Sequence, residues 1–168
     1  MISGMTASLA YRIVPSPIGE LLLVGDGRTL RRLAFVRDEP PPIDEGWTPD
    51  THGVLDPVRR ELDAYFAGRL TRFGTAVTPH GTPFQQKVWT ALVEIPYGET
   101  RSYGQLARHI GAERAVRAVG AANGANPIAI IVPCHRVIGA NGSLTGFGGG
   151  LPVKRALLDL EQGNLRLL

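Results

Sequence analysis

Residues 133–137 read PCHRV, and they hold the only cysteine of the chain, Cys134, directly before His135. The apolar run PIAIIV at residues 127–132 leads into them, and the glycine-rich loop GSLTGFGGG at residues 142–150 follows. An apolar run bounded by prolines predicts a buried extended segment. Such a segment would carry Cys134 from the core to the edge of a site made of flexible backbone, which suits a shielded nucleophile.

The composition is that of a globular protein, with 168 residues of which 43% are hydrophobic and 20% charged. No window approaches the ~18 consecutive apolar residues that a membrane helix requires. The first ten residues show neither the basic nor the apolar region of a signal peptide. A single cysteine excludes an internal disulfide, and a reducing cytoplasm is the natural setting for a free thiol. We therefore expect a cytoplasmic protein without membrane contact.

The charge is divided unevenly along the chain. Residues 1–79 hold nine Lys and Arg against ten Asp and Glu, a net charge of −1, and residues 80–168 hold nine against five, a net charge of +4. The C-terminal half is therefore the candidate for binding a polyanion. The alternative is that +4 on one domain is ordinary surface charge.

The N-terminal half predicts an antiparallel meander with strands at residues 9–14, 20–24 and 30–36. A stiff, polar loop with three prolines follows at residues 37–50. Asp56 before Pro57 predicts an N-cap and the first turn of a helix that ends near Phe66. Residues 70–77 can add one more strand. The segment around residues 78–81 is the expected boundary between two domains, 1–79 and 80–168.

The C-terminal half predicts helices. The sequences TPFQ at residues 82–85 and SYGQ at residues 102–105 both have the capping-box pattern that begins a helix. A third helix is expected over residues 113–122 and a last one over residues 152–162. The helix from Ser102 to Ile110, the turn at Gly111 and the third helix form a candidate helix-turn-helix.

The third of these helices is thin, because alanine and glycine occupy residues 118 and 120–122, while Arg114 and Arg117 project from it. A thin helix can enter a DNA groove or pack closely in a core. On helix and charge alone the core interpretation is favoured, because helix-turn-helix patterns occur in many proteins that bind no DNA.

Cys134 has two interpretations. A free cysteine is most often a small buried hydrophobe, but an adjacent imidazole can remove the thiol proton and leave the nucleophilic thiolate. Neighbours on a strand point to opposite faces, so Cys134 and His135 cooperate only if the chain leaves the strand or a water bridges them. A third group should orient the imidazole, and spacing does not choose between Glu161 and Asp159. The four histidines lie apart, so no metal site is predicted.

Several motifs in a fixed order resemble the O6-alkylguanine-DNA alkyltransferases, also called methylated-DNA–protein-cysteine methyltransferases. The resemblance covers nearly the whole chain, is strongest over residues 82–161, and implies an α+β fold. The N-terminal domain would be a ribonuclease-H-like antiparallel sheet with a helix, and the C-terminal domain a helical, winged-helix-like unit with a helix-turn-helix. The motifs are IVPCHRVI at 131–138, FQQKVW at 84–89, YGE at 97–99, SY at 102–103, RAVG at 117–120 and NP at 126–127.

The resemblance implies roles at matching positions. Cys134 would accept the alkyl group. His135 would deprotonate the Cys134 thiol through a water, and Glu161 would orient the imidazole. Asn126 would brace the active-site segment, and Tyr103 would help rotate the nucleotide out of the duplex and contact the guanine. The implied DNA contacts come from Arg117, which fills the gap in the base stack, and from Tyr103, Ala118, Ala121 and Asn123; the implied base pocket comprises Val137, Phe147 and Gly148.

Two departures from the family pattern are visible. Phe147 stands where family members often have tyrosine, so its ring can still stack on a base but the hydroxyl contact is lost. The single cysteine is incompatible with the cysteine-rich zinc module that larger relatives carry at the N-terminus.

We therefore expect a DNA repair protein that moves an alkyl group from O6-alkylguanine to its own Cys134, once per molecule, after flipping the base through the minor groove. Its partner would be double-stranded DNA containing that lesion, and it would need no cofactor because the protein is itself the acceptor. We expect a monomer in solution; cooperative assembly on DNA and the preferred alkyl size stay open. Two alternatives are a lesion-binding protein without transfer, a group that lacks the acceptor cysteine, and a cysteine hydrolase indifferent to DNA.

Overall fold

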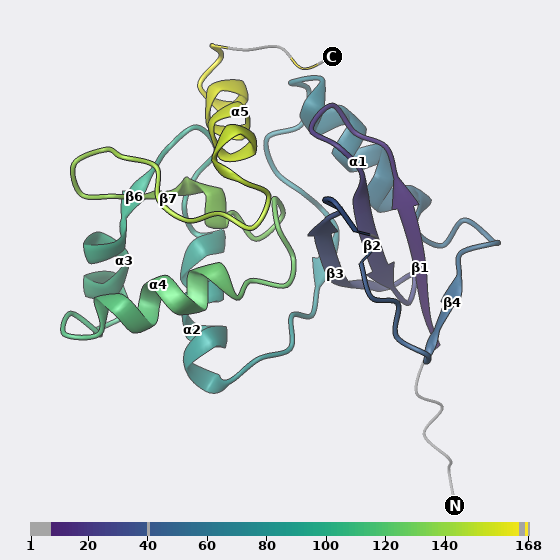
Figure 1. The fold of residues 1–168 in the computed structure, drawn as a ribbon, viewed down its shortest axis with the longest axis horizontal. Helices are drawn as coiled ribbons and strands as arrows, with labels where there is room; N and C mark the ends of the chain where they lie inside the picture. Colours follow the sequence, from purple (N-terminus) through teal and green to yellow (C-terminus); the bar gives the residue numbers. More distant parts are fainter. Residues whose placement is uncertain (1–7, 40, 165–166, 168) are drawn as a thin grey trace, which may run out of the picture.

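The computed structural model describes residues 8–39, 41–164 and 167. A β-sheet with one helix, made by the N-terminal half, lies beside a group of helices made by the C-terminal half (Figure 1). Within the described residues, no helix combines the length and apolar character needed to cross a membrane.

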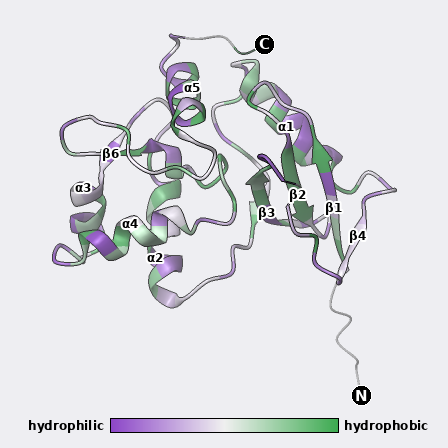
Figure 2. Cartoon of the chain, in the orientation of Figure 1, coloured by the Kyte–Doolittle hydropathy of each residue, from purple (hydrophilic) through white to green (hydrophobic). Residues whose placement is uncertain are grey.

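The sheet has five strands in the order β4-β1-β2-β3-β5. The strands β1 (Leu9–Val14), β2 (Leu21–Gly25) and β3 (Thr29–Phe35) form the predicted antiparallel meander. Short parallel strands, β4 (Trp47–Pro49) and β5 (Ala76–Val77), flank it. Every residue of β2 is buried, and its ribbon is hydrophobic in Figure 2, so this strand lies at the centre of the N-terminal core.

Two expectations about this half were wrong in detail. The loop at residues 37–50 contains β4, which is three residues long and edge-placed, so it has too little pattern to stand out beside the prolines. The strand expected over residues 70–77 is reduced to Ala76 and Val77, because the amides of Gly74 and Thr75 bond to the Glu61 side chain and not to a neighbouring strand.

Helix α1 (Asp56–Phe66) covers the sheet with its apolar side, on which Val58, Leu62, Tyr65 and Phe66 are buried. The sequence predicted Asp56 as the N-cap of this helix, and that prediction was wrong, because Leu55 occupies the N-cap position. Asp56 is the first helical residue and forms an ion pair with Arg12 of β1. Asp50 accepts the amides of Val54 and Leu55 before the helix instead.

The C-terminal half contains α2 (Pro83–Val93), α3 (Tyr103–His109), α4 (Val116–Gly124) and α5 (Leu151–Glu161). Both predicted capping boxes are present, at Thr82 and at Ser102. Helix α4 begins three residues later than expected. A two-stranded parallel sheet of β6 (Arg101–Ser102) and β7 (Val137–Ile138) lies near the start of α3.

The apolar run at residues 127–132 is buried, as predicted, but it is not an extended segment. Only Ile128 pairs with a strand, through two backbone hydrogen bonds of 3.0 Å that flank it and join the run to Leu33 of β3. The chain then turns tightly, with Ile130 at a φ of 70°. The apolar composition of this run correctly indicated that it is buried. Its backbone path is set by the pairing of Ile128 with the edge of β3 and by the turn at Ile130.

Candidate active site

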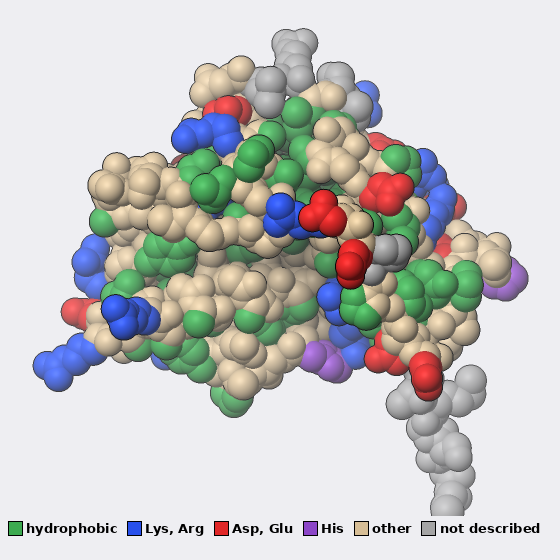
Figure 3. All heavy atoms as spheres, viewed as in Figure 1, with side chains coloured by type: hydrophobic (Ala, Val, Ile, Leu, Met, Phe, Trp, Pro, Cys, Tyr) green, Lys and Arg blue, Asp and Glu red, His purple; other side chains and the backbone are tan. Residues whose placement is uncertain are grey.

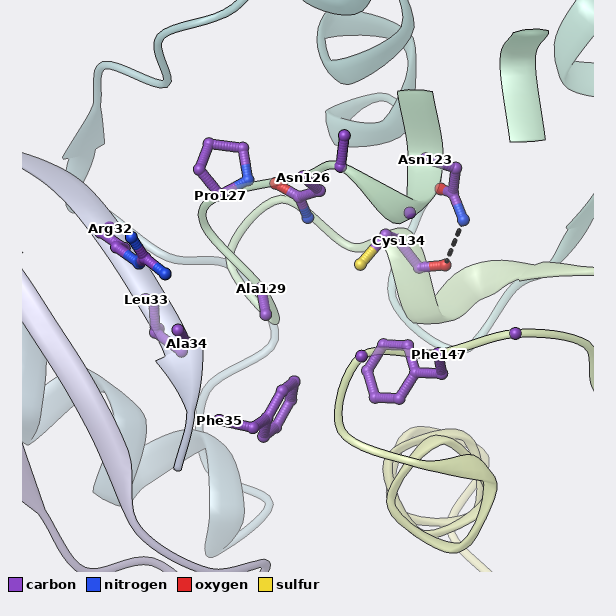
Figure 4. Close-up of a pocket in the computed structure, with 14 residues that line it drawn as sticks. Arg32, Leu33, Ala34, Phe35, Asn123, Asn126, Pro127, Ala129, Cys134 and Phe147 are labelled. Carbon is purple, nitrogen blue, oxygen red and sulfur yellow. Dashed lines mark hydrogen bonds between the residues drawn. The ribbon is translucent and has the colours of Figure 1, made fainter. Parts of the chain in front are cut away.

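The chain changes direction at the cysteine, in the single turn of 3-10 helix η1 (Cys134–Arg136). This turn meets the requirement that the segment leave the extended conformation for neighbouring side chains to cooperate. Cys134 is 7% exposed, and its sulfur points into a cavity (Figure 4), while His135 is fully buried. The turn therefore places a thiol at the cavity and an imidazole behind it.

Glu161, at the end of α5, is the carboxylate that meets the imidazole. The distance between His135 Nε2 and Glu161 Oε2 is 2.6 Å, and both side chains are completely buried. The sequence left Glu161 and Asp159 open as partners, and the helix turns only Glu161 inward. Arg136 holds the same carboxylate from the other side, with Nε 2.7 Å from Oε1 and Nη2 3.1 Å from Oε2.

The charges of these groups follow from their surroundings. Burial would raise the pKa of Glu161, but the hydrogen bonds and charges of His135 and Arg136 lower it to about 2. Burial lowers the pKa of His135, against the hydrogen bond and charge of Glu161, which raise it. Arg136 and Glu161 thus form a buried ion pair, and His135 is neutral at neutral pH.

The proton of the neutral imidazole can be placed by chemistry. An ionised carboxylate only accepts hydrogen bonds, so Nε2 carries the proton and Nδ1 presents its lone pair. Within the described part of the chain, no polar atom partners the buried Nδ1. Burial also raises the pKa of the Cys134 thiol, with smaller opposing effects from Asn126 and Lys154. The resting site therefore holds a protonated thiol together with a neutral base.

The cavity in front of the sulfur has a volume of about 380 Å³ and lies between the two halves of the chain. Figure 4 shows Arg32 and Phe35 of β3 on one side and Phe147 of the glycine-rich loop on the other. The size is within the usual range for a small-molecule pocket. Its lining consists of Arg32, Leu33, Ala34, Phe35, Asn123, Gly124, Ala125, Asn126, Pro127, Ala129, Cys134, Gly146, Phe147 and Gly148.

Asn126 braces the segment before the cysteine. Its Oδ1 accepts the amide of Ile128 at 3.0 Å, and its Nδ2 donates to the carbonyl of Val132 at 2.7 Å. These two bonds close the turn at residues 127–132 from inside. Asn126 thus fixes the backbone of the segment that leads directly to Cys134.

The N-terminal half holds the glycine-rich loop in place. The rings of Phe35 and Phe147 meet edge to face with centroids 5.3 Å apart, and Arg37 Nη1 donates to the carbonyl of Gly148 at 3.3 Å. Of the three residues that the resemblance implied for a base pocket, Phe147 and Gly148 line this cavity, whereas Val137 is fully buried and outside its lining. The Val137 carbonyl accepts from Lys154 Nζ at 2.6 Å.

Helix α4 presents a thin outer face. Arg117, Ala118 and Ala121 are exposed along it, and basic side chains outnumber acidic ones on the visible face over α3 and α4, at the lower left of Figure 3. The resemblance also placed Asn123 among the DNA contacts, but its side chain does not lie on this outer face. Asn123 is 3% exposed and lines the cavity, and its Nδ2 lies 3.4 Å from the carbonyl of Cys134.

Tyr103 begins α3 next to this face. Its hydroxyl accepts a hydrogen bond from Thr145 Oγ1 at 3.1 Å, and its ring lies against α4 at Gly120. It is half-buried and outside the lining of the cavity. Tyr103 therefore stands between the outer face of α4 and the glycine-rich loop.

Three buried residues that bond within the site were not singled out in the sequence: Tyr65, Arg136 and Lys154. Arg136 and Lys154 did leave a signal, since each is a charged residue in an otherwise apolar pattern. Lys154 shares the inner face of α5 with Leu157, Leu158 and Glu161, at helical spacing. Lys154 is fully buried and donates to the carbonyls of Val137 and Thr145, so it ties β7 to the glycine-rich loop.

Acid is expected to destabilise this site in two steps. His135 and Glu161 both have lowered pKa values in the folded protein. Each group therefore stabilises the fold at pH values above its ordinary pKa, and this stabilisation is lost as the pH falls. The His135 contribution should fade below its ordinary value of 6.5, and that of Glu161 should be lost from 4.5 down to about 2. The Glu161 step corresponds to about 3 kcal/mol. Urea unfolding across this pH range tests both, and stability that stayed flat from neutral pH to about pH 3 would contradict them.

Within the part of the chain that the structure describes, no group of three or more His, Cys, Asp or Glu is placed to hold a metal ion.

Comparison with known proteins identifies relatives of both halves. The family model described as "6-O-methylguanine DNA methyltransferase, ribonuclease-like domain" matches residues 9–79, and the one described as "6-O-methylguanine DNA methyltransferase, DNA binding domain" matches residues 83–163. The fold class expected from the sequence, α+β with a ribonuclease-like N-terminal part and a DNA-binding C-terminal part, is confirmed.

Individual relatives are similar over nearly their whole length. The methylated-DNA–protein-cysteine methyltransferase of Mycobacterium tuberculosis (strain ATCC 25618 / H37Rv) is 57% identical over 152 residues, which are 90% of this chain and 92% of the relative. That of Methanosarcina mazei is 51% identical over 157 residues, 93% and 99% of the two chains. A crystal structure of Mycobacterium tuberculosis OGT in complex with DNA superimposes with a TM-score of 0.86 at 55% identity, covering 92% and 94% of the two chains.

Proposed function

The chain belongs to the methylated-DNA–protein-cysteine methyltransferases, and from this premise we propose that Cys134 accepts the alkyl group of O6-alkylguanine in double-stranded DNA. The resemblance in sequence and the assignment as a DNA repair methyltransferase are confirmed by the relatives. The observation that supports Cys134 as the acceptor is its position, at a cavity and next to a buried His135–Glu161 pair.

The reaction is a displacement at saturated carbon. The sulfur of Cys134 forms a bond to the alkyl carbon while the bond from that carbon to guanine O6 breaks. The thiol proton passes through a water to Nδ1 of His135, and the guanine gains a proton or a hydrogen bond as negative charge develops on it. Tyr103 is our candidate for that donor. A neutral imidazole with a bare Nδ1 is the state that this step requires.

The reaction consumes the protein. The product at Cys134 is a thioether, which has no good leaving group, so each molecule completes one turnover and needs no cofactor. We also propose that the protein acts in a reducing cytoplasm, where its thiol stays free, and that its active form is a monomer. We propose two domains, residues 1–79 and residues 80–168.

The alkyl group lies inside the base stack, so the nucleotide must leave the duplex at a cost of a few kcal/mol. We propose that α4 enters the minor groove with Ala118 and Ala121 against the DNA, where small side chains allow close approach. Arg117 would then fill the space that the base leaves and offset part of this cost.

Replacing Arg117 by alanine should slow transfer from duplex DNA by at least tenfold and leave stability within about 0.5 kcal/mol, because the side chain is exposed. Transfer from the free base O6-methylguanine, which needs no flipping, should stay unchanged. Arg155→Ala removes an exposed charge from α5 and is the matched control. Equal losses on duplex and free base, or unfolding of the Arg117 variant, would count against this role.

The direct test of the proposed function is to mix the protein with a duplex that carries O6-methylguanine and to map the adduct by mass spectrometry. We expect one methyl group on Cys134 and none with the same duplex carrying guanine. Tight lesion binding without an adduct would favour the lesion-binding alternative. Repeated turnover of an ester without DNA would favour the hydrolase.

A further inference from the structure

Tyr65 connects the N-terminal half directly to the pair that prepares Cys134. It lies near the end of α1, and its hydroxyl donates to Glu161 Oε2 at 2.6 Å, 96 residues away in the chain. The side chain is fully buried. Among the described residues, Tyr65 is the only one from the N-terminal half that forms a hydrogen bond to Glu161.

The carboxylate of Glu161 accepts from three separate segments. Oε2 accepts from Tyr65 of α1 and from His135 and Arg136 of η1, and Oε1 accepts from Arg136 and from the amide of Gly98 at 3.2 Å. Five donors on two oxygens leave the carboxylate one orientation. Because Oε2 serves both Tyr65 and His135, the position of the tyrosine hydroxyl helps to set the position of the imidazole.

The ring of Tyr65 is itself held in place. It lies against Phe66 and Phe73, with centroids 5.4 Å away in both cases, and edge-on to Tyr97 at 6.2 Å and 87°. An aromatic ring that is packed on several sides has little freedom, so its hydroxyl is presented to Glu161 in a fixed place. The N-terminal half thereby delivers one rigid donor to a carboxylate whose other hydrogen-bond donors among the described residues come from the C-terminal half.

We propose that Tyr65 is a positioning residue of the transfer reaction, through which the N-terminal half completes the active site. Its hydroxyl fixes Glu161, and Glu161 in turn holds the His135 imidazole with Nδ1 free to receive the thiol proton. The proposal rests on the proposed function, and it gives the N-terminal half a part in catalysis for which the sequence offered no residue.

The substitution Tyr65→Phe tests this inference, since it removes the hydroxyl and keeps the ring. We expect the single-turnover rate constant for methyl transfer from duplex DNA to fall about tenfold, the loss typical of one hydrogen bond to a charged group. Binding of the same duplex should be unchanged, because the hydroxyl is buried far from the exposed face of α4.

The pH profile supplies a readout that a purely structural role would not move. The titratable and charged groups that face Glu161 are Tyr65 of α1, Tyr97 of the turn after α2, and His135 and Arg136 of η1. The charged groups that act on the His135 imidazole itself are Glu161, Arg136 and Lys154 of α5. With one donor removed, the carboxylate acts more strongly on the imidazole, which then holds its proton to higher pH. The acid limb of the rate profile should therefore move to higher pH in Tyr65→Phe.

Val58→Ala is the matched control, because Val58 is buried on the same helix but lies outside the site. It should lower stability and leave the rate constant and the pH profile unchanged. A Tyr65→Phe rate within twofold of the unmodified protein, or a loss that Val58→Ala reproduces, would overturn the inference. If the unmodified protein transferred no methyl group at all, the proposed function would fail instead, so the two failures are distinguishable.

Discussion

Cys134→Ala is expected to abolish alkyl transfer while the protein still folds and binds duplex DNA. The sulfur is the atom that forms the new bond, and the chain has no second cysteine that could replace it. The alanine variant loses one buried heavy atom, which should cost about 1 kcal/mol of stability or somewhat more. Transfer from a labelled oligonucleotide measures the first effect, and fluorescence anisotropy with the same duplex measures the second.

Cys134→Ser sharpens this experiment, because it keeps the size of the side chain and removes only the strong nucleophile. It should bind DNA as the alanine variant does and transfer no detectable methyl group. A methyl group that still reached the protein in either variant would mean that another residue is the acceptor, and the mechanism proposed here would be wrong.

Glu161→Ala should have the largest effect on stability of any single change at the site, about 3–5 kcal/mol. The reason lies in what it leaves behind. Arg136 would keep a buried positive charge without its partner, and His135, Tyr65 and Gly98 would each lose an acceptor. Unfolding in urea measures the loss. Transfer should also slow by two orders of magnitude or more, because the imidazole loses the group that sets its proton and orientation.

Asp159→Ala is the natural control for this change, since it removes a carboxylate from the same helix two residues earlier. Asp159 is only half-buried, so its loss should change stability by about 0.5 kcal/mol or less and leave transfer intact. If the two variants behaved alike, the buried network around Glu161 would not be the source of stability or of rate.

The predictable parts of the molecule are those encoded within a few residues. The capping boxes at Thr82 and Ser102 close between side chains and amides three positions apart, so their sequence signature is complete. The meander likewise follows from alternating patterns and short turns. Cys134 and His135 were identifiable because a thiol and an imidazole are rare and adjacent.

The parts that sequence could not predict depend on distant segments. The path of residues 127–132 is set by Leu33 of β3, and no local pattern encodes that contact. Asn123 was placed among the DNA contacts by the resemblance alone, and no local pattern shows that packing turns its side chain toward Cys134. The role of Tyr65 was not visible in the sequence, since nothing in spacing identifies which buried hydroxyl meets a carboxylate 96 residues later.

The hydrogen bonds between Leu33 and the segment at Ile128 have a consequence for solubility. One edge of β3 is occupied by β5 at Thr29 and Leu30 and by this segment at Leu33. An uncovered strand edge offers unpaired amides and carbonyls to other chains and promotes aggregation. The segment that delivers the cysteine thus also shields the sheet. If the two halves were produced separately, the N-terminal half would be expected to self-associate through β3.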